Sequence, residues 1–196
     1  MTLSDKISIG LAIAAFLFGS GFLLALWDRI NLKKRLKSEK RLAKAERTLY
    51  GFLRPLKSLL DRNRKIHDDF ASRFDLKSLE PAPDYIRQRI YQCTPDEQER
   101  KFWFSRLETL IENNDQAIEL IQAHIGLLPD TDLSKSLGGY MSHAEAFSDI
   151  WRKIKSDDPL PPGLNPSAVL YADQYPLTLD RELVDEIVNC RKIINA

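Results

Sequence analysis

An unbroken apolar run near the N-terminus dominates the hydrophobic pattern of the chain. Residues 7–27 read ISIGLAIAAFLFGSGFLLALW, 21 residues without a charged side chain. Because an α-helix rises ~1.5 Å per residue, this run would form a helix about 31 Å long, which matches the hydrocarbon core of a bilayer. The pattern therefore predicts one N-terminal transmembrane helix, preceded by a short extracytoplasmic tail over residues 1–6.

The main alternative to a retained span is a cleaved signal peptide. The apolar run exceeds the ~7–15 residues that are typical of a signal-peptide core, and no small-residue cleavage site ends it. Its N-terminal flank offers only Lys6, which Asp5 balances. These features favour a retained membrane anchor over a removed signal peptide or a buried core helix.

A dense group of basic residues, here called the basic neck, follows the apolar run within residues 29–47. Its nine members are Arg29, Lys33, Lys34, Arg35, Lys37, Lys40, Arg41, Lys44 and Arg47. Since segments rich in Lys and Arg stay on the cytoplasmic side, this asymmetry predicts an N-terminus outside and a cytoplasmic C-terminal domain. Trp27 lies where an interfacial aromatic anchor would lie. The short tail and compact size favour a cell membrane of bacterial type, the inner membrane.

The basic neck has two interpretations. One is contact with anionic lipid head groups, which contributes about 1 kcal/mol for each Lys or Arg near the surface. The other is nucleic-acid binding. The neighbouring bilayer is sufficient for the first, and the neck lacks aromatic residues that would stack on bases. The predicted partner is therefore a lipid bilayer with anionic head groups, and no nucleic acid is expected.

Small residues at four-residue spacing lie within the apolar run. Ala15 with Gly19, and Gly21 with Ala25, would let a second membrane helix approach closely. This packing face predicts either a homo-oligomer or contact with another subunit of a larger membrane complex.

From Leu42 onward, apolar residues recur at spacings of three and four. They are Leu42, Ala45, Leu49, Phe52, Leu56, Leu59, Ile66 and Phe70. That spacing is typical of a coiled coil or of the buried face of a bundle helix, and we favour the bundle helix. Asn63 falls at an a-like position, where a polar side chain can fix the register. Pro55 predicts a kink near Arg54, which divides a basic juxtamembrane helix (28–54) from an acidic helical-bundle domain (55–196).

The domain over residues 55–196 shows helical periodicity and no strand-like alternation of useful length. Beyond the first helix, the expected helices cover residues 84–93, 95–125, 132–155 and 180–194. Thr94 is the predicted N-cap of the helix that starts at Pro95. A Pro-rich loop over 157–166 would be a lid, a docking strip or a plain connector. The predicted fold class is all-α: one N-terminal transmembrane helix, a kinked juxtamembrane helix and a cytoplasmic helical bundle.

Charge divides the chain more sharply than the formal net charge of +1 indicates. Residues 28–65 hold 14 Lys and Arg against four Asp and Glu, whereas residues 66–196 hold 14 against 23. A basic neck therefore carries an acidic body, which would face a protein partner. Cys93 and Cys190 lie far apart, and their spacing indicates neither a disulfide framework nor a zinc site. They suit a reducing compartment.

Two histidine motifs are the candidates for chemistry. His67-Asp68-Asp69 resembles the HD dyad of metal-dependent phosphohydrolases, but no histidine precedes it to complete a metal shell. His143-Ala144-Glu145 has the H-x-E pattern of zinc deaminases without the P-C-x-x-C half. His124 lies one turn before a predicted helix end, where a cation suits the helix dipole. We assign no catalytic, cofactor-binding or metal-binding residues and expect no cofactor.

These patterns favour a single-pass membrane-anchored protein whose cytoplasmic helical domain is an interaction or scaffold module without evident catalytic chemistry. The alternative is a membrane-bound hydrolase of unfamiliar type that assembles His67, Asp68, His143 or Glu145 across helices. A third interpretation is an accessory subunit of a larger membrane complex, packed through the small residues of the apolar run. The pattern does not identify the protein partner.

Overall fold

The computed structural model describes the backbone of residues 3–74, 83–129, 131–155 and 175–196. Within these ranges, it leaves out the side chains of residues 3–7, 9–14, 16–23, 83–85 and 154. The predicted Pro-rich loop over 157–166 lies outside the described residues. The chain divides into two compact units, Met1–Lys44 and Ala45–Ala196, and each is described by itself.

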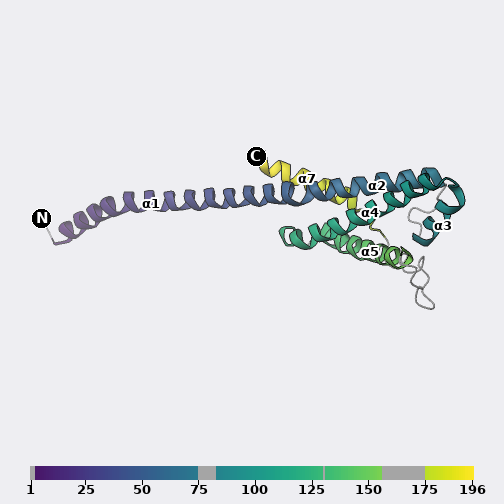
Figure 1. The fold of residues 1–196 in the computed structure, drawn as a ribbon. Helices are drawn as coiled ribbons and strands as arrows, with labels where there is room; N and C mark the ends of the chain where they lie inside the picture. The colour runs from purple at the N-terminus through teal and green to yellow at the C-terminus, as the bar shows by residue number, and fades with distance from the viewer. Residues whose placement is uncertain (1–2, 75–82, 130, 156–174) are drawn as a thin grey trace. The chain divides into compact units, whose positions relative to one another are not determined.

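Helix α1 (Leu3–Thr48) forms the first unit and continues into the second (Figure 1). One continuous helix therefore holds both the apolar run and the basic neck. The described side chains that follow the middle of the run are exposed, with 64% of Leu24 and 65% of Trp27 accessible to solvent. Along the described part of the chain, no helix is both long and apolar enough to cross a membrane.

The predicted interruption before Pro55 is a single π-helical turn rather than a break. This segment covers Leu49–Leu53, and helix α2 (Arg54–Phe74) follows it directly. The backbone N–H of Arg54 donates to the carbonyl of Leu49, five residues earlier, which is the wider π-helical pattern. Proline has no N–H and its ring crowds the preceding turn, and a wider turn accommodates both effects.

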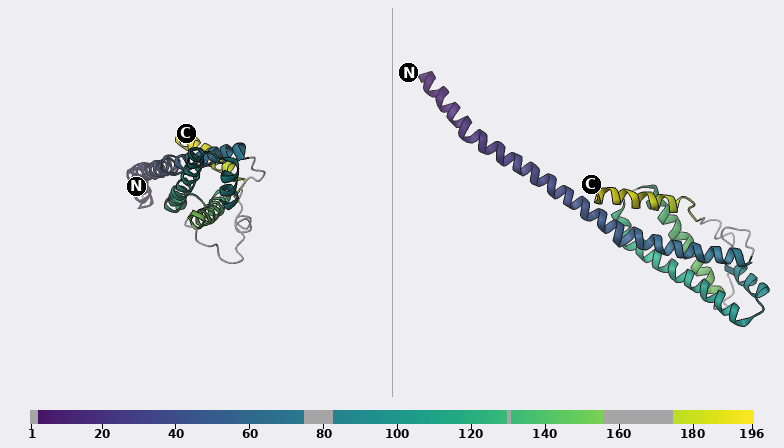
Figure 2. Two further views of the ribbon diagram at one scale, coloured as in Figure 1. Left: turned by 45° about the vertical axis from the view of Figure 1, so that its right-hand side comes forward. Right: turned by 90° about the horizontal axis from the view of Figure 1, so that it is seen from above.

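The second unit is a helical bundle, as the periodicity predicts. After α2 come α3 (Pro83–Cys93), α4 (Glu97–His124), a short 3-10 turn (Ile125–Leu127), α5 (Asp132–Lys155) and α7 (Leu179–Ile194). Helix α2 lies along α4, and α5 packs against α4 on another side (Figures 1 and 2). Helix α7 contacts α5, α2 and the π-helical turn. Every element in the described ranges is helical, which confirms the all-α class.

The buried face of the segment from Ala45 to Phe74 packs inside this bundle. Two hydrophobic clusters result. One surrounds Leu49, Phe52 and Leu56 and includes residues of α4, α5 and α7. The other surrounds Phe70 and Phe74 and includes residues of α3, α4 and α5. Since a fully buried large apolar side chain contributes ~1.5–3 kcal/mol, these clusters hold the helices together and leave a polar layer around Asn63 between them.

The N-cap of α4 differs from the prediction. Asp96, not Thr94, caps the helix, and its carboxylate accepts from the backbone N–H groups of Gln98 (3.1 Å) and Glu99 (3.0 Å). Thr94 instead closes α3, because its own backbone N–H donates to the carbonyl of Ile90 at 3.1 Å. The sequence TPDE contains two suitable caps, and the end of the preceding helix decides between them.

Candidate functional site

A layer of hydrogen-bonded polar side chains lies between the two hydrophobic clusters. Asn63 of α2 donates to the Asn114 side-chain oxygen at 2.7 Å and accepts from Asn113 at 2.9 Å. The hydroxyl of Tyr140 on α5 donates to the same Asn114 oxygen at 2.9 Å. Burial raises the pKa of Tyr140, so the phenol stays protonated and able to donate. The layer therefore ties α2, α4 and α5 in one register.

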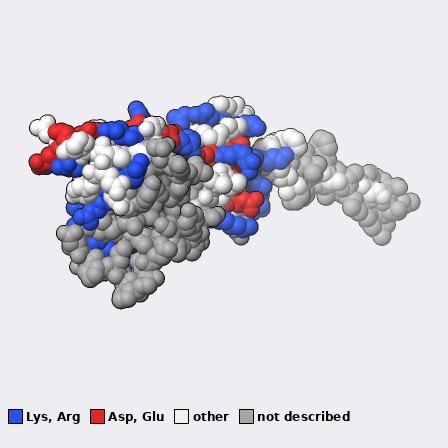
Figure 3. All heavy atoms as spheres, turned by 90° about the vertical axis from the view of Figure 1, so that its right-hand side faces the viewer, with Lys and Arg blue, Asp and Glu red and all other residues white. Residues whose placement is uncertain are grey.

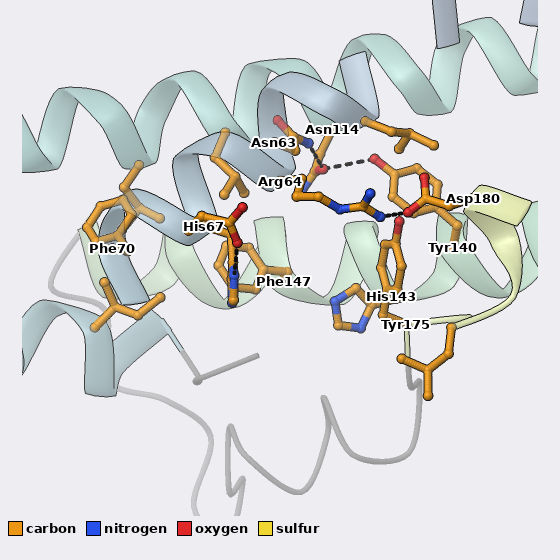
Figure 4. A pocket seen from close by; sticks show the side chains of 16 residues that line it. Asn63, Arg64, His67, Phe70, Asn114, Tyr140, His143, Phe147, Tyr175 and Asp180 are labelled. Carbon is orange, nitrogen blue, oxygen red and sulfur yellow. Dashed lines mark hydrogen bonds and ion pairs between the residues drawn. The ribbon is translucent and has the colours of Figure 1, made fainter. Parts of the chain in front are cut away.

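A cavity of about 280 Å³ opens beside this layer (Figure 4). Its apolar end is lined by Phe70, Ile86, Leu107 and Phe147, which come from four different helices. Its polar end is lined by Asn63, Arg64, Tyr140, His143, Tyr175 and Asp180. Residues from α2, α5 and the start of α7 thus converge on one space although they are distant in sequence.

An ion pair between Arg64 and Asp180 crosses the polar end and joins α2 to α7. Only one carboxylate oxygen of Asp180, Oδ2, takes part, and the other oxygen is buried without a hydrogen-bond partner. Nearby, His67 Nδ1 lies 3.9 Å from a carboxylate oxygen of Asp68, and His67 Nε2 is likewise buried without a partner. Buried polar atoms are usually paired, so Asp180 Oδ1 marks the polar end as chemically unsatisfied, and His67 Nε2 is a second unsatisfied atom that lies closer to Phe147 (Figure 4).

Tyr175 brings aromatic rings to the same end. Its ring centroid lies 6.0 Å from that of Tyr140 and 6.1 Å from that of His143, and it meets both rings nearly at right angles. Edge-to-face contacts of this kind stabilise a fixed arrangement of rings. His143 is buried, with 7% of its surface exposed. The polar end therefore has a rigid aromatic wall.

The structure brings three of the four candidate hydrolase residues together. His67, Asp68 and His143 line the same cavity, whereas Glu145 is exposed and is not among the lining residues. Asp69 forms an ion pair with Arg106 instead. Across the described residues, no three His, Cys, Asp or Glu side chains are grouped so as to hold a metal ion.

The remaining histidine has a packing role. The ring of His124 stacks on Phe52 with centroids 5.7 Å apart, and its Nδ1 lies 3.1 Å from the Leu120 carbonyl oxygen. The two cysteines, Cys93 and Cys190, are free thiols. Both features belong to the helix packing rather than to the cavity.

All nine side chains of the basic neck are exposed, and none forms an ion pair within the described chain. Because α1 is one regular helix, residues spaced three and four apart share a face. Lys33, Lys37, Lys40, Lys44 and Arg47 follow this spacing and form a stripe along the helix. The stripe is a continuous, unneutralised positive surface.

Many cations of the body are paired across helices. Arg73 contacts Glu99 at 2.9 Å, Arg152 contacts Asp115 at 2.8 Å and Lys155 contacts Glu108 at 2.7 Å. The face drawn in Figure 3 accordingly shows basic and acidic atoms interleaved over the described part of the body.

The predicted packing face of the apolar run is only partly described. Ala15 and Ala25 are exposed. The surroundings of Gly19 and Gly21 lie outside the described residues. Self-association through this packing face therefore stays a prediction.

The charged pair and the tyrosine at the polar end of the cavity were not predicted from the sequence: Arg64, Asp180 and Tyr175. Asp180 has the pattern of an ordinary first-turn helix acid, and Arg64 that of a solvated helix cation. Only the packing of α7 on α2 brings them together, and no local pattern contains that information.

Comparison with known proteins adds no assignment. No family model matches the chain, and no curated protein or solved structure matches it either.

Proposed function

We propose that the protein is a single-pass membrane protein whose cytoplasmic helical domain is an interaction module for another protein. Residues 7–27 form the anchor, with the N-terminus outside. The observation that carries this proposal is the position of the exposed and unpaired basic neck, directly after 21 residues without charge. Such a neck suits the cytoplasmic surface of a membrane, where anionic head groups replace the missing acidic partners.

Because α1 is continuous, the expected contact with lipid head groups should decrease along the basic neck with distance from Trp27. At ~1.5 Å per residue, Arg29, Lys33, Lys34 and Arg35 (the proximal group) lie within about 12 Å of Trp27 along the axis. Lys40, Arg41, Lys44 and Arg47 (the distal group) lie about 20–30 Å from it. Surface charge is screened within ~8 Å at physiological salt. If α1 follows the bilayer normal, the proximal group therefore supplies most of the lipid contact.

The outer face of α7 supports the interaction role. Val184 and Val188 lie one turn apart on this face and are 43% and 40% exposed. Apolar side chains that gather on an exposed face are typical of protein-binding surfaces. We therefore place the partner contact on this face of α7.

Alkaline carbonate extraction of membranes tests the anchor. The wild-type full chain should remain in the membrane pellet. A double variant, Leu11→Arg with Phe18→Arg, should be released, because an arginine costs about 2.5–3.5 kcal/mol near the centre of a span, where Phe18 lies, and the second arginine adds to this cost. Leu32→Arg with Leu36→Arg adds the same charge outside the run and should stay in the pellet. Release of the wild-type chain by carbonate would refute the anchor.

Photo-crosslinking in native membranes tests the partner surface. A photoreactive side chain at Val188 should give one discrete adduct, identified by mass spectrometry, whereas the same group at the exposed Lys101 should not. Equal, diffuse labelling from both positions would contradict a specific surface on α7.

A membrane-bound hydrolase is the second candidate, favoured by the convergence of His67, Asp68 and His143 on one cavity. A histidine there would act as general base on a bound water. Full-length protein incubated with p-nitrophenyl esters and phosphates should then show turnover that His67→Gln or His143→Gln abolishes and Glu145→Gln retains. Absence of turnover above buffer, or equal turnover in all variants, would exclude this candidate for those substrates.

A further inference from the structure

The cavity beside the polar layer has the division of surface that small-molecule sites have. Phe70, Ile86, Leu107 and Phe147 form one end, and the polar groups are concentrated at the other. Ligand sites commonly combine an apolar body with a few convergent polar groups and enclose ~300–1,000 Å³ for drug-sized ligands. A volume of about 280 Å³ therefore suits a smaller compound with one apolar end and one polar end.

The unpaired buried atoms that line the cavity indicate whether the polar head of the ligand donates or accepts hydrogen bonds. Asp180 Oδ1 is a buried acceptor without a donor, while Oδ2 is occupied by Arg64. Leaving such a group unpaired is costly, and a ligand that donates a hydrogen bond would recover that cost. His67 Nε2 is a second buried atom without a partner among the lining residues, and it accepts or donates according to its tautomer. Asp180 Oδ1, as a carboxylate oxygen, can only accept. The ligand head is therefore a donor.

The charged side chains around the cavity indicate whether the hydrogen-bonding head of the ligand is cationic, neutral or anionic. Among the lining residues, Asp68 and Asp180 supply two carboxylates, and Arg64 is already paired with one of them. The rings of Tyr140 and Tyr175 lie near Asp180, whereas Asp68 lies beside His67 and its side chain is 68% exposed (Figure 4). Aromatic faces attract cations. A positively charged head is favoured over a neutral one, and an anionic head is disfavoured.

From these three observations we infer that the cavity binds a small amphipathic ammonium compound. Its protonated amino group donates to Asp180 Oδ1 beside the tyrosine rings, and its apolar body lies against Phe70 and Phe147. Because the cavity is lined by α2, α5 and α7, a bound compound would bridge the helix that carries the proposed partner surface to the rest of the bundle. This site is independent of the membrane anchor, so either proposal can fail without the other.

Equilibrium dialysis with the full chain in nanodiscs tests the inference, with empty nanodiscs subtracted to remove partitioning into lipid. Three probes share one apolar body and differ in the head group: 2-phenylethylamine, 2-phenylethanol and 3-phenylpropanoate. The amine should show saturable binding at least tenfold tighter than the alcohol, and the carboxylate should show none. Equal binding of the carboxylate, or no saturable binding of the amine, would overturn the inference.

A matched pair of variants locates the binding. Asp180→Asn should weaken amine binding at least tenfold, whereas Asp185→Asn, which removes the same charge from an exposed position on α7, should leave it unchanged. Asp180→Glu should retain part of the affinity. Equal affinity of Asp180→Asn and Asp185→Asn would overturn the assignment. If circular dichroism shows that Asp180→Asn is unfolded, the three-probe comparison on the wild-type chain decides the question.

Discussion

The cations of the body and those of the basic neck are the same residue types on the same kind of helix, yet they are used differently. In the body, Arg152 reaches Asp115 on α4 and Lys155 reaches Glu108, so each charge bridges two helices. In the neck, nine cations are exposed along one helix and none forms an ion pair in the described chain. Charge that is paired contributes to the fold, and charge that is left unpaired remains available to an external partner.

The contrast also explains why the net charge is uninformative. The 29 Lys and Arg nearly balance the 28 Asp and Glu over the whole chain. The net charge is near zero because an excess of basic residues in the neck offsets an excess of acidic residues in the body.

The largest effect should come from neutralising the proximal group of the neck. Replacing Arg29, Lys33, Lys34 and Arg35 with Gln removes the cations nearest the apolar run, which set orientation in the membrane. A uniform N-out population should become a mixed one, measured by labelling a cysteine in the N-terminal tail with a membrane-impermeant maleimide. The distal group replaced with Gln is the matched control and should stay N-out. An equal mixture of the two orientations in both variants would contradict a larger contribution from the proximal group.

A large stability loss should follow from Asn114→Leu in the body. This change removes the acceptor of both Asn63 and Tyr140 and leaves two buried donors unpaired, at about 1–3 kcal/mol each. We expect a decrease of about 2–4 kcal/mol in the free energy of unfolding, measured by urea denaturation of the full chain. Asn189→Leu on the exposed side of α7 should change it by less than about 0.5 kcal/mol. A negligible effect of Asn114→Leu would exclude the polar layer as a structural tie.

A smaller effect should separate the two classes of cation directly. Arg152→Gln removes a bridge between α5 and α4, but both partners are about half exposed, so the loss should be only about 0.5 kcal/mol. Lys44→Gln in the neck should not alter stability. A double-mutant cycle with Asp115→Asn isolates the coupling free energy between Arg152 and Asp115. A coupling energy of zero for Arg152 and Asp115 would show that the body pairs, too, are merely solvated.

The smallest effect concerns acid sensitivity. Hydrogen bonds from Arg73, followed by one from Trp103, lower the pKa of Glu99 below 4.5. A lowered pKa means that the contribution to stability is present above the pKa of the unfolded chain and is lost as the pH falls through that of the folded chain. In Arg73→Gln, the pKa of Glu99 should rise toward 4.5, measured by carbon NMR of the carboxyl group. An unchanged pKa would show that the ion pair is not populated in solution.

The helices were predictable because their signals are local. The apolar spacing of three and four predicted the buried face from Ala45 to Phe70, although Leu42, the first residue of the predicted pattern, is 36% exposed. The helices over 132–155 and near 180–194 match α5 and α7 closely. The interruption before Pro55 was also predictable in position. Its π-helical form was not, because it depends on how the turns on either side are packed.

The site was predictable only in fragments. Asn63 was singled out as a register residue, but its hydrogen bond to Asn114 joins positions 51 residues apart. The ion pair of Arg64 with Asp180 depends on a packing of α7 that no single-segment pattern encodes. His67 and His143 were noted for separate motifs, and only the bundle brings them to one cavity.

The central claim is that the unpaired neck marks the cytoplasmic end of a membrane anchor. Two variants of a chain that also carries Cys93→Ser and Cys190→Ser, so that each has a single cysteine, test this placement: Ser4→Cys before the apolar run and Ser38→Cys within the neck. In intact cells, a membrane-impermeant maleimide should label Ser4→Cys and leave Ser38→Cys unlabelled, whereas both should react after permeabilisation. Labelling of both positions, or of neither, in intact cells would contradict the account.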